Sequence, residues 1–345
     1  SFSVGSLLQL DSTLSVSGGF RSNISIDQSS LEGYVEGQDI LFQNLSREYA
    51  LDTLSIQAMI SPTASSFHYY TDDGNANLES NFDIRDAGEV FQAWSGKHFK
   101  LSDPKNHPEG TRALQFNIQL ENAPPFLLLG IDVDDFSSID ISGALDEKEE
   151  TLMLQATSGK FKGYGVSLDT LSTKITALRD SVNARLQVEN MFYKTTEIGD
   201  LELDMFAKGD TTTSNLLLSH DSITLLGLRT RLLSTDSGIF IFPDHLQLLE
   251  YQYSMDRKNP VYIDKTRKNM VLDHFLITHD SMQIVLDGNL SAFDINLRNA
   301  DLTHLNYLLS RDTTIINKGR LNGNVSYSQD QELNINAAID SLSLY

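Results

Sequence analysis

The sequence contains no cysteine, and this absence excludes disulfide bonds, thiol catalysis and zinc sites built on thiolates. Basic residues are scarce, because 26 Lys and Arg stand against 47 Asp and Glu and leave a formal net charge of −21. An acidic surface repels phosphate backbones, so we do not expect nucleic-acid binding. No run of about 18 apolar residues suggests a membrane helix. With 345 residues, 40% of them hydrophobic, the chain is long enough to bury a sizeable core.

Both ends of the sequence suggest that it was taken from a longer chain. The chain begins SFSVGSLLQL, with neither Met nor a charged-then-apolar leader, and it stops at INAAIDSLSLY within an alternating segment. We therefore expect a fragment of a longer chain, with any signal or anchor outside it.

Alternation of apolar and polar residues with a period of two dominates the sequence. In LQFNIQL (114–120), the apolar residues lie on one face of a strand and the polar residues lie on the other. LELDMF (201–206), FDINL (293–297) and LNINAAI (333–339) repeat the pattern. The sequence predicts a mainly β protein, a long antiparallel sheet of iterated hairpins with one apolar face. Sandwiches and closed barrels share this alternation, so the pattern alone does not choose between them and an open groove.

Asp-Ser pairs recur just before strand-like segments. The carboxylate of Asp bonds backbone N–H groups two positions on, so these pairs predict chain reversals. The Asp-Ser pairs are 11–12, 180–181, 221–222, 236–237, 280–281 and 340–341, and Asp-Thr at 52–53 and 169–170 behaves alike. Two pairs follow a histidine, giving the triad letters His220–Asp221–Ser222 and His279–Asp280–Ser281. Three consecutive side chains diverge, so neither set can line up as a hydrolase triad.

One segment shows helical spacing. In FDIRDAGEVFQAWSGKHF (82–99), Asp83 is a plausible N-cap and Gly96 a plausible stop. We expect a helix near 84–95 that packs against the sheet and plugs or gates one end of it. Its apolar stripe is Ile84, Ala87, Phe91 and Trp94.

A second short helix is predicted in ADLTHLNYLLS (300–310), with Leu302, Leu305, Leu308 and Leu309 on one side. Boundaries between domains are faint. The polar, proline-containing stretch at 121–145 is the best candidate, separating an N-terminal β-rich part (1–130) from continuing repeats (131–345). We expect these parts to form one continuous repetitive domain.

Candidate ligand-binding residues are dispersed. Two acid-rich stretches offer oxygen ligands for Ca²⁺: Asp72, Asp73, Asn75, Asn77 and Glu79, and Asp132, Asp134, Asp135 and Asp140. Neither fits the twelve-residue calcium loop, and Asp73-Gly74 is a strong hairpin turn, so we favour solvated turns over a metal site. The eight histidines are scattered. We predict no metal, no cofactor and no enzymatic activity.

FDINLRNADLTHLNYLLSRDTTIINKGRLNGNVSYS (293–328) resembles an element of the TamB and AsmA-like proteins of the bacterial envelope. In that element a strand L-x-L-x-N precedes a short leucine-rich helix, a polar stretch and a G-x-L-x-G-x-V strand. The matching residues are Ile295, Leu297 and Asn299; Leu302, Leu305, Asn306, Leu308 and Leu309; and Gly319, Leu321, Gly323 and Val325. SSLEGYVEGQDILF (29–42) resembles a related strand pair, and the Asp-Ser habit is most similar to Bacteroidetes members. The stretches 82–99 and 101–110 have no counterpart in the family.

The resemblance implies a sheet curled into an open hydrophobic groove, the β-taco. It also implies phospholipid transport between inner and outer membranes, assembly of outer-membrane proteins with a BamA-like partner, and a periplasmic location with an inner-membrane anchor. A chain without cysteine suits that compartment. The expected groove-lining residues are Leu114, Phe116, Ile118, Leu120, Leu201, Leu203, Met205, Ile284, Leu286, Phe293, Ile295 and Leu297.

A different function class remains open from the residues themselves. A β-sandwich-type surface module that binds glycan or protein would show a closed core and exposed aromatic side chains in a shallow cleft. The candidate aromatic residues are Tyr69, Tyr70, Tyr251 and Tyr253.

Overall fold

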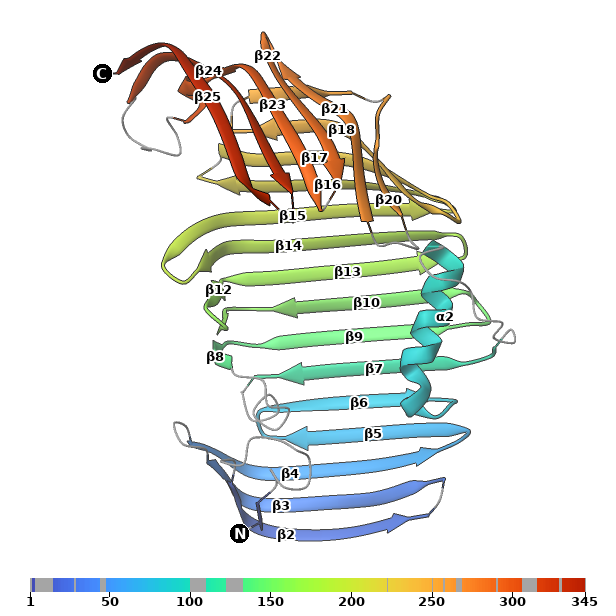
Figure 1. Ribbon diagram of the computed structural model, residues 1–345. Coiled ribbons are helices and arrows are strands. Elements are labelled where there is room, and N and C mark those ends of the chain that lie inside the picture. The colour runs from blue at the N-terminus through green and yellow to red at the C-terminus, as the bar shows by residue number, and fades with distance from the viewer. Residues whose placement is uncertain are drawn as a thin grey trace. The chain divides into compact units, whose positions relative to one another are not determined.

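The chain is almost entirely antiparallel β-structure, which confirms the predicted fold class (Figure 1). It divides into two compact units, Ser1–Gly209 (unit 1) and Asp210–Tyr345 (unit 2). The computed structural model describes residues 2–3, 15–27, 29–43, 48–99, 110–121, 133–221, 223–249, 251–256, 258–264, 269–289, 291–305, 315–328 and 331–344.

Unit 1 is a sheet in which most strands pair with their neighbours in sequence. Its strands are β1 (Phe2–Ser3), β2 (Ser15–Ile26), β3 (Leu31–Gln43), β4 (Glu48–Ser61), β5 (Ala64–Thr71), β6 (Gly74–Ser80), β7 (Ala113–Leu120), β8 (Val133–Phe136), β9 (Ile139–Asp146), β10 (Thr151–Ser158), β11 (Phe161–Gly163), β12 (Val166–Leu168), β13 (Thr170–Leu178), β14 (Ser181–Tyr193) and β15 (Thr196–Lys208). The long strands pair in the order β2, β3, β4, β5, β6, β7, β9, β10, β13, β14, β15. The short strands β8, β11 and β12 pair with one another and with the end of β14, and form a side wall.

The sheet continues through the stretch where we expected a division. Strands β7 and β9 pair over their full length, from Ala113 opposite Asp146 to Leu120 opposite Ile139. The boundary predicted near 121–145 therefore falls inside unit 1, and the two compact units divide between Gly209 and Asp210 instead.

The register aligns the apolar side chains of β6 to β15 into four rows on one face, counted here from the side that the helix covers. The first row is Ser80, Leu114, Leu145, Leu152, Ala177, Val182 and Ala207; the second is Leu78, Phe116, Gly143, Leu154, Ile175, Ala184 and Met205; the third is Ala76, Ile118, Ile141, Ala156, Thr173, Leu186 and Leu203; the fourth is Gly74, Leu120, Ile139, Ser158, Leu171, Val188 and Leu201. Polar residues such as Asn117, Gln155 and Lys174 occupy the reverse face, as period-two alternation requires.

The helix lies between β6 and β7 in sequence and crosses the apolar face (Figure 1). It consists of a 3₁₀ turn, η1 (Ile84–Asp86), followed by α2 (Ala87–Phe99). The predicted N-cap is confirmed, since the Asp83 carboxylate accepts the N–H of Arg85 at 3.0 Å. The predicted stop at Gly96 is wrong, because α2 continues to Phe99.

The buried stripe of α2 also differs from the prediction at one position. Val90 is 1% exposed and packs with Trp94 and the first row, whereas Phe91 is 37% exposed. Val90 lies three residues after Ala87 and four before Trp94, so it continues the i, i+3, i+4 spacing better than Phe91 does. Ser65 fixes the start of the helix, since its hydroxyl donates to the Phe82 carbonyl at 3.1 Å and accepts the Ile84 N–H at 3.0 Å.

Long strands turn corners at β-bulges, which bend a strand and increase its twist. At three corners the bulged residue has a left-handed φ of about +50°, and its N–H is accepted by a side-chain oxygen from the next strand. The pairs are Asn190 with Asp200 (2.8 Å), His274 with Asp287 (2.6 Å) and Asn299 with Asn322 (2.8 Å). Apolar spacing changes from two to three there, for instance from Leu272 to Phe275. The corners are therefore encoded locally, by a polar residue that tolerates the left-handed region and a partner that satisfies its backbone.

Unit 2 is also antiparallel and built of iterated hairpins. Its elements are β16 (Thr211–His220), β17 (Ile223–Ser234), β18 (Gly238–Leu248), β19 (Tyr251–Met255), β20 (Val261–Asp264), β21 (Asn269–His279), β22 (Met282–Asn289), β23 (Ala292–Asp301), the 3₁₀ turn η2 (Leu302–Leu305), β24 (Ile316–Ser328) and β25 (Gln331–Leu344). The helix predicted at 300–310 is represented by η2, whose Leu302 is buried beside Gly319 of β24. Leu308 and Leu309 lie outside the described residues, as does Asn306 of the family pattern.

The predicted chain reversals at Asp-Ser are confirmed in most places. The pairs at 236–237 and 280–281 lie between consecutive strands, Asp180 directly precedes β14, and Asp221 follows β16. Asp-Thr at 169–170 is an exception, because β12 and β13, on either side of Asp169, both pair antiparallel with β14 and therefore run in the same direction. Asp-Thr at 52–53 and Asp-Ser at 340–341 are exceptions as well, because they lie inside β4 and β25. The N–H groups of Asp52 and Thr53 donate to the Asp72 carboxylate, and Ser341 has a left-handed φ, so these two pairs belong to bends within a strand. The pair at 11–12 lies outside the described residues.

Candidate functional site

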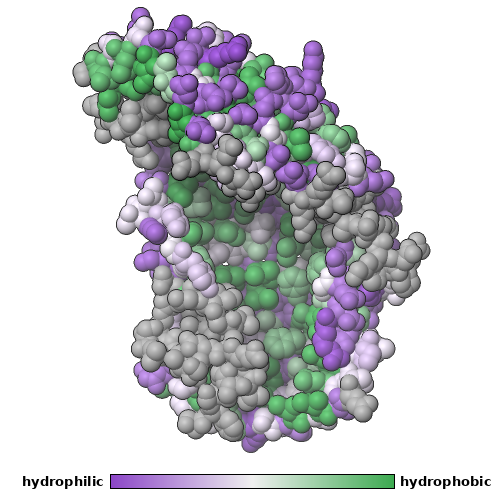
Figure 2. Space-filling model, viewed as in Figure 1, coloured by the Kyte–Doolittle hydropathy of each residue, from purple (hydrophilic) through white to green (hydrophobic). Residues whose placement is uncertain are grey.

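The candidate site is an apolar furrow in unit 1, whose floor is the third row. Every member of that row is partly exposed, although the row is made almost entirely of aliphatic side chains. Thr173 is the one polar member of the row. Its hydroxyl donates to the Arg185 carbonyl at 3.2 Å, so the polar group already has a partner within the sheet. Figure 2 shows that this face of the sheet is hollowed and lined with hydrophobic side chains.

Helix α2 forms one bank of the furrow. Val90 and Trp94 pack with the first row, so Leu145 is only 2% exposed. In the second row, Phe116 and Ile175 pack against the same cluster. The Phe116 ring lies across Gly143 on the next strand, since a Cβ there would lie 2.5 Å from the ring. The first row is therefore largely occupied by the chain's own packing, whereas Leu154, Ala184 and Met205 of the second row are partly exposed, as the third row is.

The side wall marks the opposite bank. Val133 of β8 is 1% exposed, and Leu168 of β12 is also buried. In the fourth row, Leu120 and Val188 are buried as well. Asp169 separates β12 from β13, and the bulge at Asn190 turns the end of β14 towards its pairing with β12. The rows on both sides of the third row therefore contain some buried residues, but most of their side chains are partly exposed as well.

The seven groove-lining residues predicted in unit 1 all lie on the apolar face. Ile118 and Leu203 belong to the third row and line the furrow. Leu114 does not line it, because α2 covers the first row and leaves that side chain in the buried cluster. Phe116 and Met205 belong to the second row, and Leu120 and Leu201 to the fourth. Sequence reasoning missed the strands between β7 and β15, where Ile141, Ala156, Thr173 and Leu186 complete the third row.

The five residues predicted in unit 2 also share one face. Ile284 lies opposite Leu297 and Leu286 opposite Ile295 on the antiparallel pair β22–β23. Phe293 contacts Tyr327 of β24 with ring centroids 5.3 Å apart. Unit 2 therefore carries an apolar strip of its own, built from β22 and from the segment 293–328 that carries the family resemblance.

The tyrosines considered for glycan binding do not gather into a shallow cleft within either unit. Tyr69 and Tyr70 are adjacent on β5, so they point to opposite faces; burial raises the pKa of Tyr69, and Tyr70 is exposed. Tyr253 is buried, and it and Tyr251 both contact the His279 ring, with centroids 5.2 and 5.5 Å away. Tyr69, Tyr251 and Tyr253 therefore take part in packing, whereas Tyr70 is exposed and lines a cleft without the other three tyrosines.

Acidic residues from the two acid-rich stretches, which we interpreted as solvated turns, converge on one cleft of about 410 Å³ at the strand ends of unit 1. Asp72 and Asp73 line it together with Glu121 and Asp140. Burial alone would raise the pKa of Asp72, but the N–H groups of Thr53 and Asp52 outweigh that effect and lower it. The Asp72 carboxylate therefore already accepts hydrogen bonds from two backbone N–H groups of β4. Asp132 lies outside the described residues, and only the backbone of Asp134 is described.

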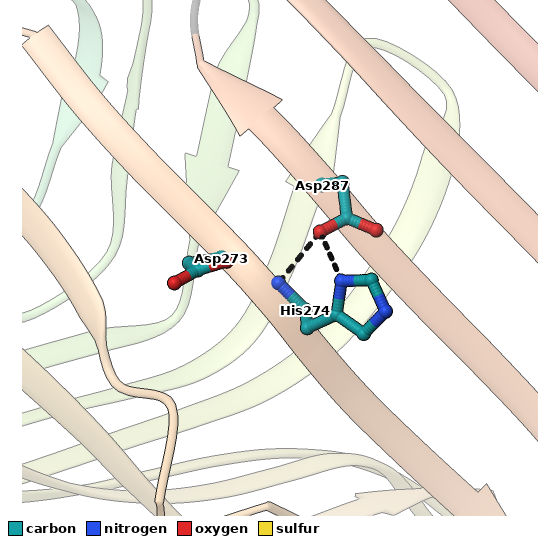
Figure 3. A group of neighbouring side chains, drawn as sticks. All are labelled: Asp273, His274 and Asp287. Atoms are coloured by element: carbon teal, nitrogen blue, oxygen red, sulfur yellow. Dashed lines mark hydrogen bonds and ion pairs between the residues drawn. The ribbon is translucent and has the colours of Figure 1, made fainter.

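A second group of potential ligands, missed from the sequence, lies in unit 2 at the corner of β21. Asp273, His274 and Asp287 each place one ligand atom within 4.8 Å of the others. Figure 3 shows that His274 and Asp287 face each other, with the Nδ1 of His274 2.8 Å from the Asp287 carboxylate. The same carboxylate accepts the His274 N–H, so its evident role is to stabilise the bulge. The sequence contains a signal for this corner, because Asp273 and His274 fill a three-residue step between the apolar residues Leu272 and Phe275.

The two His-Asp-Ser segments form local contacts. The Nε2 of His220 lies 3.2 Å from the Asp221 carboxylate, and the Nε2 of His279 lies 3.7 Å from that of Asp280. The Nδ1 of His279 contacts the Gln252 carbonyl at 2.7 Å. Each histidine therefore contacts the aspartate that follows it at a hairpin end, and His279 also contacts the backbone of the neighbouring strand β19.

Comparisons with protein families, with curated proteins and with solved structures found no match to this chain. No helix in the described part of the chain is long and apolar enough to span a membrane. The function has to be inferred from the furrow itself.

Proposed function

We propose that this protein is a non-enzymatic module that shields the acyl chains of phospholipids in an apolar β-groove. The observation that carries the proposal is the third row, a continuous file of partly exposed side chains, all aliphatic except Thr173, across seven strands of unit 1. Water-facing apolar surface that is this continuous is characteristic of a binding site. The proposal includes the periplasm as the location and a BamA-like barrel as the expected protein partner, both on the family resemblance alone.

The energetics favour a passive role. Moving a 16-carbon acyl chain into water costs about 12 kcal/mol at roughly 0.8 kcal/mol per methylene. A furrow with an aliphatic floor and two apolar banks removes much of that penalty without chemical catalysis. The polar reverse face and the net charge of −21 favour contact of the reverse face of the sheet with water.

The direct test is lipid capture by the purified chain. The protein is incubated with vesicles of dipalmitoylphosphatidylcholine, separated from them, and analysed by native mass spectrometry and by extraction with chromatography. We expect bound lipid. Its complete absence from protein that is folded by circular dichroism would refute the proposal.

A matched pair of variants locates the binding surface. Ile118→Asp places a carboxylate on the floor of the furrow, where contact with hydrocarbon is unfavourable. Asn117→Asp places the same group on the reverse face of the same strand. We expect Ile118→Asp to lower bound lipid at least tenfold and Asn117→Asp to leave it unchanged. Equal binding by both variants would move the site away from the third row.

A further inference from the structure

One aromatic side chain stands within a polar row on the reverse face of unit 1. Tyr70 on β5 lies directly opposite Asn75 on β6, and Gln119 on β7 and Asp140 on β9 continue the row. The other members of this row are also polar: Arg21, Glu36, Ser55, Thr157, Ser172, Gln187 and Glu202. Tyr70 is 60% exposed, so packing in a core does not account for its ring.

Tyr70 and its three neighbours in the row line the cleft of about 410 Å³ described above. The cleft lies at the ends of β5, β6 and β7 that are remote from α2 (Figure 1). Its rim is closed where the N–H of Glu121 donates to the Asp73 carbonyl at 2.8 Å. The volume is within the range of roughly 300–1,000 Å³ that is usual for small-molecule sites.

The two side chains between Tyr70 and Asp140 are amides that bond each other. The Nδ2 of Asn75 donates to the Oε1 of Gln119 at 3.2 Å, which holds the two amides side by side. This bond uses one donor of Asn75 and the carbonyl of Gln119, so the Oδ1 of Asn75 and the Nε2 of Gln119 can bond a ligand. The lining therefore offers an aromatic face, an amide donor, an amide acceptor and a carboxylate.

The charge of the cleft limits the class of ligand. Asp72, Asp73, Glu121 and Asp140 all line it, and the described part of the lining contains no lysine or arginine. An anion would therefore be repelled. A simple cation would have no use for the amide donor of Gln119. Hydroxyl groups suit both kinds of partner, because each can donate to a carboxylate and accept from an amide.

We propose that this cleft binds a neutral saccharide. The apolar C–H face of a sugar ring stacks on the Tyr70 ring. The hydroxyl groups at its rim donate to Asp140 and to the Oδ1 of Asn75, and accept from the Nε2 of Gln119. The site uses one exposed tyrosine, and it is independent of the furrow, which lies on the opposite face of the sheet.

Isothermal titration calorimetry of the full chain, in buffer that contains EDTA, tests the proposal. The probes are neutral trisaccharides of glucose, galactose, mannose and N-acetylglucosamine, and the trisaccharide of galacturonic acid is the anionic counterpart of the galactose probe. We expect saturable binding of at least one neutral probe and no binding of the galacturonate. Failure of all four neutral probes to bind, or galacturonate binding as tight as theirs, would overturn the proposal.

Two matched pairs of variants locate the bound sugar. Tyr70→Ala removes the stacking surface, so we expect about fivefold weaker binding or worse, whereas Tyr70→Phe keeps the ring and should stay within about twofold of the wild type. Gln119→Ala removes the amide donor and should also weaken binding by about fivefold. Gln115→Ala, on the same face of β7 but opposite Glu79 and outside the cleft, should have no effect.

Wild-type affinity in both Tyr70→Ala and Gln119→Ala would place the sugar elsewhere and overturn the site. Circular dichroism identifies a variant that does not fold, and the other variant then decides. Neither result bears on lipid capture, which Ile118→Asp tests on the opposite face.

Discussion

Two leucines on the same face of unit 1 offer a test of whether the furrow is open. Leu145 is 2% exposed beneath α2, and Leu186 is a partly exposed member of the third row. Replacing Leu145 by alanine removes buried methyl groups and leaves a cavity, so we expect a loss of about 3 kcal/mol in the free energy of unfolding. Replacing Leu186 by alanine removes groups that already contact water, and no closed cavity forms, so we expect about 1 kcal/mol.

The assay is urea unfolding followed by the fluorescence of Trp94, which reports on the same unit as both leucines. The difference between the variants, about 2 kcal/mol, exceeds the usual uncertainty of such measurements. If Leu186→Ala is as destabilising as Leu145→Ala, the third row is covered by protein and the furrow is not vacant. A lysophospholipid at ten times its dissociation constant should add about 1.4 kcal/mol to the stability of the wild type.

Three further predictions concern the devices that shape the sheet. Asp287→Ala leaves the His274 N–H at the β21 corner without its acceptor, so urea unfolding should show a loss of about 1–2 kcal/mol, which Asp287→Asn largely avoids. Ser65→Ala, which removes both bonds that hold the start of the helix, should be destabilising by about 1–3 kcal/mol, whereas Ser66→Ala on the reverse face should be nearly neutral. The backbone N–H groups of Ser29 and Ser30 donate to the Asp27 carboxylate and lower its pKa from 3.8 to about 2. Its carboxylate therefore stabilises the fold above about pH 4 and loses that contribution as pH falls towards 2; an NMR titration midpoint near 3.8 would contradict this.

Period-two alternation was sufficient to identify which residues share a face. Ile118 and Leu203 were assigned to one surface from their own strands alone, and the register confirms that both lie in the third row. The alternation could not reveal which rows are covered. Leu114 and Ile118 have the same local pattern, and only the packing of α2 across the sheet distinguishes a buried residue from a partly exposed one.

The corners were not predicted, although the sequence contains a signal for them. Between Val188 and Met191 the apolar spacing is three, and Asn190 in that gap tolerates a left-handed backbone. The acceptor for its N–H is Asp200, ten residues later on the next strand. A three-residue step is also what a helix would give, so the signal becomes unambiguous only when the partner strand is known.

The order of the strands has a consequence for how such a protein can change in size. Nearly every pairing in unit 1 joins segments that are close in sequence, and a helix inserted between β6 and β7 leaves their register intact. Adding or deleting one hairpin would therefore alter the extent of the sheet by about 9.6 Å and disturb only the two strands beside it. Duplication of short segments is thus a simple evolutionary route to a longer version of the same molecule.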